Sequence, residues 1–138
     1  MFHDRLLHVA DVVEAGSIEG LGFNMGAYHP EQHFTDYGGR NAERAGCLAA
    51  WTVHIAAKLT RASDLAGIPV RQTAQAWLGL DDDQTYELFS IWPPHATPAE
   101  GAQAMRSLAE TGAVKWPREP SVLNTPFTLF AAPVGALP

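Results

Sequence analysis

An apolar stretch in the middle of the chain most constrains its fold. Residues 47–59 read CLAAWTVHIAAKL and contain a single Lys or Arg and no Asp or Glu. The large apolar side chains repeat at intervals of three and four, which is the spacing of one helix face. They are Leu48, Trp51, Ile55 and Leu59. The alanines between them leave the other faces small, so neighbouring helices can approach closely. We therefore expect a buried central helix over residues 47–59.

One helix is expected before this segment and another after it. The first covers residues 3–15, where apolar side chains recur at helical spacing, and Gly16 can end it. Another opens at Pro69, since proline suits the first helical turn, and ends at Gly79. Its expected buried face includes Trp77.

Two further helices carry stronger start signals. Asp81 followed by Gln84 is a capping box, and we expect Tyr86, Leu88 and Phe89 to pack inward behind it. The last helix starts with a threonine cap, a proline at the first position and a glutamate at the third. These residues are Thr97, Pro98 and Glu100, and Gly112 follows as the stop. The expected fold class is therefore mainly α, a compact bundle of about five helices.

Residues 16–46 have a different character. Seven glycines are interspersed with aromatic and histidine side chains, which favours an irregular, well-packed segment over a helix. Residues 22–28 are a candidate extended piece, and a short β-ribbon is a second option for the segment. A loop of this length within a compact domain is usually functional.

The C-terminal residues are too rich in proline for a helix. Prolines stand at positions 117, 120, 126, 133 and 138. We expect one helical domain over residues 1–117. Residues 118–138 are then a Pro-rich tail, either docked on that body or partly flexible.

Composition limits the function classes. The 138 residues suit one domain, and charged residues make up only 17%. The formal net charge of −6 is spread evenly along the chain, so no clustered basic face is available for direct nucleic-acid binding. No run of apolar residues reaches membrane-spanning length, and no signal-peptide core is visible. We expect a soluble intracellular protein that acts away from membranes.

The single cysteine is a candidate catalytic nucleophile. Cys47 opens the apolar helix, where the helix dipole favours a thiolate, and His29 or His33 is a candidate base. The alternative is a small buried cysteine, which is the commonest role of a free thiol in a core. The second interpretation is the preferred one, and the Cys-His enzyme is retained as the alternative.

The same three residues are also a conceivable zinc ligand set. Zinc takes three or four protein ligands, and His29, His33 and Cys47 supply three if the glycine-rich segment folds back. Nothing in their spacing requires this arrangement. We therefore expect no metal site and no cofactor, and surface histidines bonded to backbone remain the preferred interpretation.

The aromatic residues of the glycine-rich segment are the candidate partner-binding residues. Such side chains anchor interfaces when they are exposed and fill cores when they are buried. The candidates, together with one nearby arginine, are Phe23, Tyr28, Phe34, Tyr37 and Arg40.

Several short motifs, taken in order, resemble a family of small uncharacterised phage and prophage proteins. The motifs are FNMGAY at 23–28, GCLAAW at 46–51, LGL at 78–80 and TGAVKW at 111–116. That family carries a Phe-Asn-Met segment followed by a Cys-x-Ala-Gly helix start. Here Ala50 stands at the glycine position, and no cysteine precedes Cys47.

The resemblance implies a mobile-element accessory protein that acts by binding a host or defence-system protein. An inhibitor of a host defence system, similar to an anti-CRISPR protein, is one form of that expectation. The Cys-His enzyme based on Cys47 is the alternative function, and the oligomeric state is left open.

Overall fold

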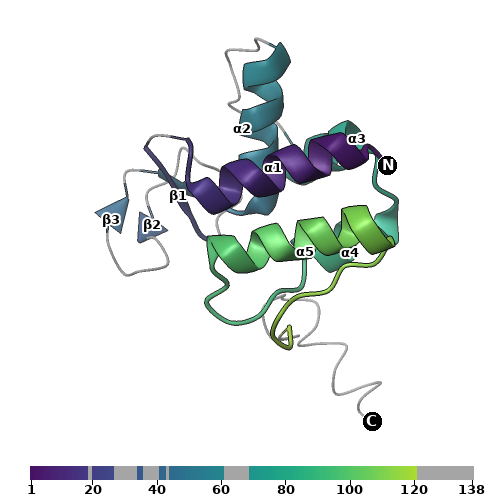
Figure 1. The fold of residues 1–138 in the computed structure, drawn as a ribbon. Helices are drawn as coiled ribbons and strands as arrows, with labels where there is room; N and C mark the ends of the chain where they lie inside the picture. The colour runs from purple at the N-terminus through teal and green to yellow at the C-terminus, as the bar shows by residue number, and fades with distance from the viewer. Residues whose placement is uncertain (19, 27–33, 36–40, 43, 61–68, 121–138) are drawn as a thin grey trace.

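A computed structural model describes residues 1–18, 20–26, 34–35, 41–42, 44–60 and 69–120. The helices in this part of the chain are α1 (His3–Ala15), α2 (Leu48–Thr60), α3 (Val70–Leu78), α4 (Asp82–Phe89) and α5 (Pro98–Thr111). The strands are β1 (Leu21–Phe23), β2 (Phe34–Thr35), β3 (Asn41–Ala42) and β4 (Arg44–Gly46). The fold is mainly α and compact, as the sequence predicts (Figure 1).

The helix boundaries follow from local capping chemistry. The side chains of Asp81 and Thr97 each accept a hydrogen bond from the backbone N–H three residues later. The side chains of Gln84 and Glu100 in turn accept one from the backbone N–H of Asp81 and Thr97, so both predicted capping boxes form. Gly16, Gly79 and Gly112 follow α1, α3 and α5 in the left-handed conformation, which glycine adopts without a Cβ penalty.

Helices α1 and α5 lie side by side, and α2 crosses them steeply (Figure 1). The two neighbours are joined at the surface by one arginine. Arg106 of α5 lies 2.8 Å from carboxylate oxygens of both Asp11 and Glu14 of α1. All three side chains are substantially exposed, so these ion pairs contribute little to the free energy of unfolding.

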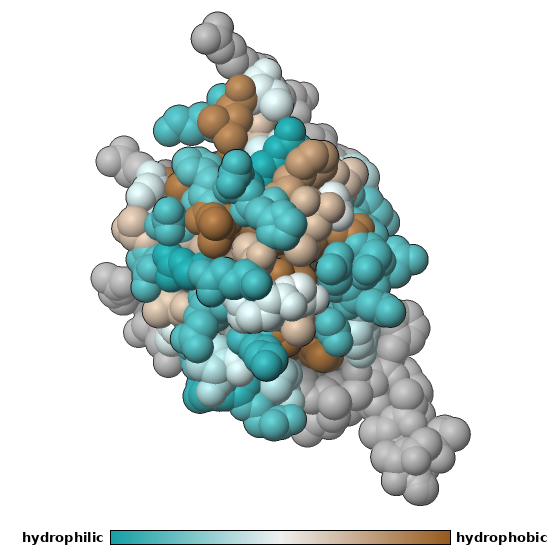
Figure 2. All heavy atoms as spheres, turned by 45° about the vertical axis from the view of Figure 1, so that its right-hand side comes forward, coloured by the Kyte–Doolittle hydropathy of each residue, from teal (hydrophilic) through white to brown (hydrophobic). Residues whose placement is uncertain are grey.

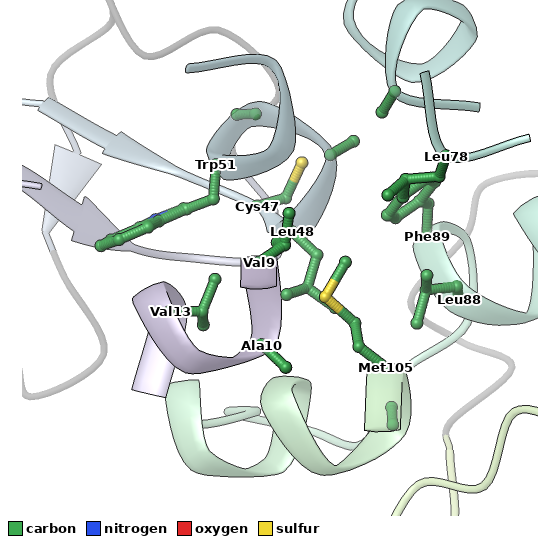
Figure 3. Packing of buried hydrophobic residues seen from close by; sticks show 14 of the residues in the cluster. Val9, Ala10, Val13, Cys47, Leu48, Trp51, Leu78, Leu88, Phe89 and Met105 are labelled. Carbon is green, nitrogen blue, oxygen red and sulfur yellow. The ribbon is translucent and has the colours of Figure 1, made fainter. Parts of the chain in front are cut away.

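The core lies where α2 begins. Leu48 is fully buried, and it and Met105 point toward one another between α1 and α5 (Figure 3). Gly101 permits this approach, because a Cβ there would lie 3.1 Å from Leu48 Cδ2 and 3.2 Å from Phe23 Cζ. A side chain at position 101 would therefore push α5 away from α2.

The strands attach the glycine-rich segment to this core. β1 pairs with β4 in parallel, with Leu21 opposite Arg44 and Phe23 opposite Gly46. β2 pairs with β3 in antiparallel fashion. The indole Nε1 of Trp51 donates a 3.0 Å hydrogen bond to the carbonyl of Gly22, so the central helix holds β1 by a buried side chain.

After α5, residues 112–120 form an irregular segment that runs back across α4 and α5. Ser107 Oγ accepts a hydrogen bond from the backbone N–H of Lys115 at 2.8 Å. Trp116 Nε1 donates to the carbonyl of Glu87, and Arg118 pairs with the Glu100 carboxylate. The predicted tail is thus attached at its first residues, and its remainder, 121–138, lies outside the described residues.

Two side chains expected in the core are exposed instead. Leu59 is 59% exposed because it lies in the last turn of α2, beyond the part that the other helices enclose. Tyr86 is 45% exposed, since α4 turns Thr85, Leu88 and Phe89 toward the core. Both predictions of burial were wrong.

No helix within the described ranges is long and apolar enough to cross a membrane.

The contact between Gly79 and Phe2 yields a stability prediction. Gly79 has φ +71°, and a Cβ there would also lie 3.0 Å from Phe2 Cδ2 and 3.2 Å from the Met1 Cα. We expect Gly79→Ala to lower the free energy of unfolding by more than the roughly 1–2 kcal/mol that the left-handed conformation alone costs. Urea unfolding followed by circular dichroism measures the change.

Gly112→Ala is the matched control, because Gly112 has φ +80° and nothing within 4 Å of the added Cβ. Adding Phe2→Ala to Gly79→Ala should recover the excess loss. Equal losses for the two glycine variants would contradict the packing described for Phe2.

Candidate functional site

Cys47 lies immediately before α2, at the centre of the core. Its carbonyl accepts the hydrogen bond from the N–H of Trp51 at 2.9 Å, and its side chain has no exposed surface. Burial raises the pKa of the Cys47 thiol from 9.0 to about 11, although the backbone N–H groups of Ala50 and Ala49 act in the opposite direction. Desolvation therefore outweighs the effect of the helix N-terminus.

This environment does not suit a catalytic thiol. A nucleophilic cysteine needs a lowered pKa and access to substrate, and Cys47 has a raised pKa and no access. The sequence correctly indicated the helix-start position but did not reveal that the side chain has no exposed surface. The candidate bases His29 and His33 lie outside the described residues.

No three His, Cys, Asp or Glu side chains gather into a possible metal site among the described residues. The set of His29, His33 and Cys47 falls partly outside them.

The candidate partner-binding aromatics have different outcomes. Phe23 is only 4% exposed, and its ring end lies 3.2 Å from where a Cβ on Gly101 of α5 would be, so of the two alternatives left open for these aromatics it fills the core. The backbone of Phe34 lies in β2, opposite Ala42. Tyr28, Tyr37 and Arg40 lie outside the described residues, and their assignment stays a prediction.

An aromatic–arginine cluster at the start of α1 is a surface feature that the sequence did not single out. The guanidinium carbon of Arg5 lies 4.3 Å from the centroid of the Phe2 ring and 4.8 Å from that of Trp77. Arg5 Nη1 also donates a 2.7 Å hydrogen bond to the Trp77 carbonyl. We call these three side chains the Arg5 cluster.

The Arg5 cluster is held in place but remains accessible. The backbone N–H of Phe2 donates to the carbonyl of Leu78 at 2.9 Å, which anchors the N-terminal segment to the end of α3. Phe2 is nevertheless 49% exposed, Trp77 is half-buried, and residues 1–5 line an open hollow of about 430 Å³. A rigid base with exposed rings is the usual arrangement of an interface anchor.

A weak signal for the Arg5 cluster exists in the sequence. Phe2 occupies the N-cap position of α1, where Ser, Thr, Asp or Asn is preferred, and it makes no side-chain cap. An aromatic residue at such a position suggests a packing role. The partner, Trp77, is distant in the sequence, so only the fold brings it to Phe2.

The surface beside this region is mixed in character. Figure 2 shows hydrophilic side chains over most of that face, with apolar areas lying separately between them. Small exposed aromatic groups within a polar surround resemble interface anchors more than a membrane-binding face.

No protein-family model matches this chain, and neither the curated proteins nor the solved structures contain a match.

Thiol accessibility tests the position of Cys47. We expect iodoacetamide to leave Cys47 unmodified at pH 6 in the native chain and to alkylate it after denaturation, because reaction requires opening of the core. Mass spectrometry after timed quenching gives the rate. Rapid alkylation of the native chain would contradict the buried site and favour the Cys-His enzyme.

The raised thiol pKa also predicts a pH dependence of stability. The folded chain binds the thiol proton more tightly than the unfolded chain, so the contribution is fully present below the unfolded value of 9.0 and is lost as the pH rises toward about 11. The full loss amounts to roughly 2–3 kcal/mol, from ~1.4 kcal/mol per pKa unit.

Urea unfolding between pH 8 and pH 11 measures that loss, with Cys47→Ala as the control. The variant retains every tyrosine and lysine but lacks the thiol, so its stability should fall less over this interval. Parallel curves for the two chains would show that the thiol pKa is not raised.

Proposed function

We propose that this chain acts by binding another protein, as a small accessory protein of a mobile element. The observation that carries the proposal is the Arg5 cluster, in which an arginine is fixed against two partly exposed aromatic rings. Tryptophan and arginine are enriched among the residues that dominate binding energy at protein interfaces. The anchored backbone of Phe2 lowers the entropy lost when a partner orders these side chains.

The partner is proposed to be a host or defence-system protein in the cytoplasm of the host cell. The resemblance of the 23–28, 46–51 and 111–116 motifs to phage and prophage proteins supports this context. The dispersed charge of −6 gives no basic face for a nucleic acid, which leaves a protein as the favoured target. Inhibition of a defence system, similar to that of anti-CRISPR proteins, is the specific form proposed.

A phage-plating assay tests this function. The chain is expressed in hosts that carry one active CRISPR–Cas system each, with a spacer against the test phage. We expect plating efficiency in a sensitive host to rise to that of the same host without the system, and we expect a component of the system to co-purify. Unchanged plating in every host, with the folded chain present, would contradict defence inhibition.

Aromatic variants then separate binding from folding. Tyr28→Ala or Phe34→Ala should weaken capture of the partner while thermal unfolding stays nearly unchanged, because these rings are proposed as interface anchors. Phe23→Ala is the matched control, because Phe23 is buried and its loss should lower the unfolding temperature. Loss of folding in all three would place these aromatics in the core.

A further inference from the structure

We infer that the Arg5 cluster and the adjoining hollow recognise an acidic peptide segment of the partner, with a carboxylate paired to Arg5 and an apolar side chain against Phe2 and Trp77. This inference rests on the proposed protein-binding function and specifies the chemistry of the bound segment. It concerns one surface, formed by the hollow that residues 1–5 line and by the Trp77 ring that lies against Arg5.

The first argument is the uneven pairing of the arginines. Among the described residues, Arg106 pairs with two carboxylates and Arg118 pairs with that of Glu100, whereas neither Arg5 nor Arg71 has an ion pair there. Arg5 has no carboxylate within ion-pair distance among the described residues, and its protein partners there are two rings and one carbonyl. The chain has 15 acidic and 9 basic groups, so carboxylates outnumber cations. The positive charge of Arg5 is nevertheless not neutralised by a carboxylate of the described residues, and it can pair with one from a partner.

The second argument is geometric. Arg5 Nη1 donates a 2.7 Å hydrogen bond to the Trp77 carbonyl, which fixes the orientation of the guanidinium group. Its remaining N–H groups have no hydrogen-bond partner among the described residues. A planar guanidinium presents paired donors that match the two oxygens of a carboxylate. Since the rings already hold the group, little side-chain freedom is lost when a carboxylate binds.

The third argument is the space beside the group. The hollow of about 430 Å³ lies within the roughly 300–1,000 Å³ range of ligand-binding pockets. It is open, and Met1 and Phe2 contribute exposed apolar surface to it. This suits the alternating charged and apolar side chains of a peptide better than a small, fully polar anion. Asp4 also lines the hollow, so a peptide with its acidic groups confined to the Arg5 side fits best.

The experiment is a selection of random twelve-residue peptides, displayed on phage, against the immobilised wild-type chain and Arg5→Gln. We expect the wild type to enrich peptides that carry Asp or Glu next to an apolar residue, and we expect Arg5→Gln to lose them. An enriched peptide should bind at least about tenfold more weakly when its carboxylates are replaced by amides, as for loss of a charge-assisted bidentate contact.

Matched variants keep the result interpretable. Arg71→Gln removes the same charge from α3 without touching the rings and should behave as wild type, whereas Arg5→Lys should bind with intermediate affinity because it keeps charge but lacks the planar fork. Thermal unfolding shows whether each variant is folded. If Arg5→Gln unfolds, the comparison of acidic and amide peptides on the wild type still decides the question.

Three results would overturn the inference: no enrichment by the wild type over Arg5→Gln, enrichment of peptides without acidic residues, or equal binding of the acidic and amide peptides. Competition by free acetate or phosphate at the same affinity as the peptide would identify an anion site instead of a peptide site. Plating assays are scored separately, so defence inhibition with no acidic-peptide selection would reject this surface and retain the proposed function. Selection of acidic peptides without defence inhibition would retain this surface as a peptide-binding site and reject the proposed function.

Discussion

The packing of the first turn of α2 between α1 and α5 is the constraint on which the rest of the structure depends. Leu48 occupies the space between the two helices, and Gly101 allows α5 to come close enough to enclose it. The same turn holds β1, because Trp51 donates its indole hydrogen bond to the Gly22 carbonyl. Helix pairing and the attachment of the glycine-rich segment therefore share one buried centre, and a volume change there should affect both.

This centre also determines what the chain can do chemically. It encloses Cys47, so the residue that the sequence offers for nucleophilic chemistry is fully buried, and desolvation raises its thiol pKa. The groups proposed for recognition lie at the periphery instead, where the start of α1 meets the end of α3. A rigid core with a pre-arranged aromatic and cationic surface is an arrangement suited to binding.

Local signals were sufficient to predict most of the helical fold. The capping boxes at Asp81 and Thr97 and the stop glycines at 16, 79 and 112 depend on neighbours within a few residues, so sequence alone defines them. Features that depend on distant neighbours were missed or misassigned. The burial of Phe23 requires Gly101, and the Arg5 cluster requires Trp77, which no spacing rule connects to Phe2.

Native-state hydrogen exchange tests the central claim most directly. If the start of α2 is the last part of the structure to open, the amides of Thr52, Val53 and Ile55 should exchange only through global unfolding. Their exchange free energies should then equal the free energy of unfolding measured with urea. Exchange of these amides at a lower free energy than those of α1 and α5 would contradict a core organised around α2.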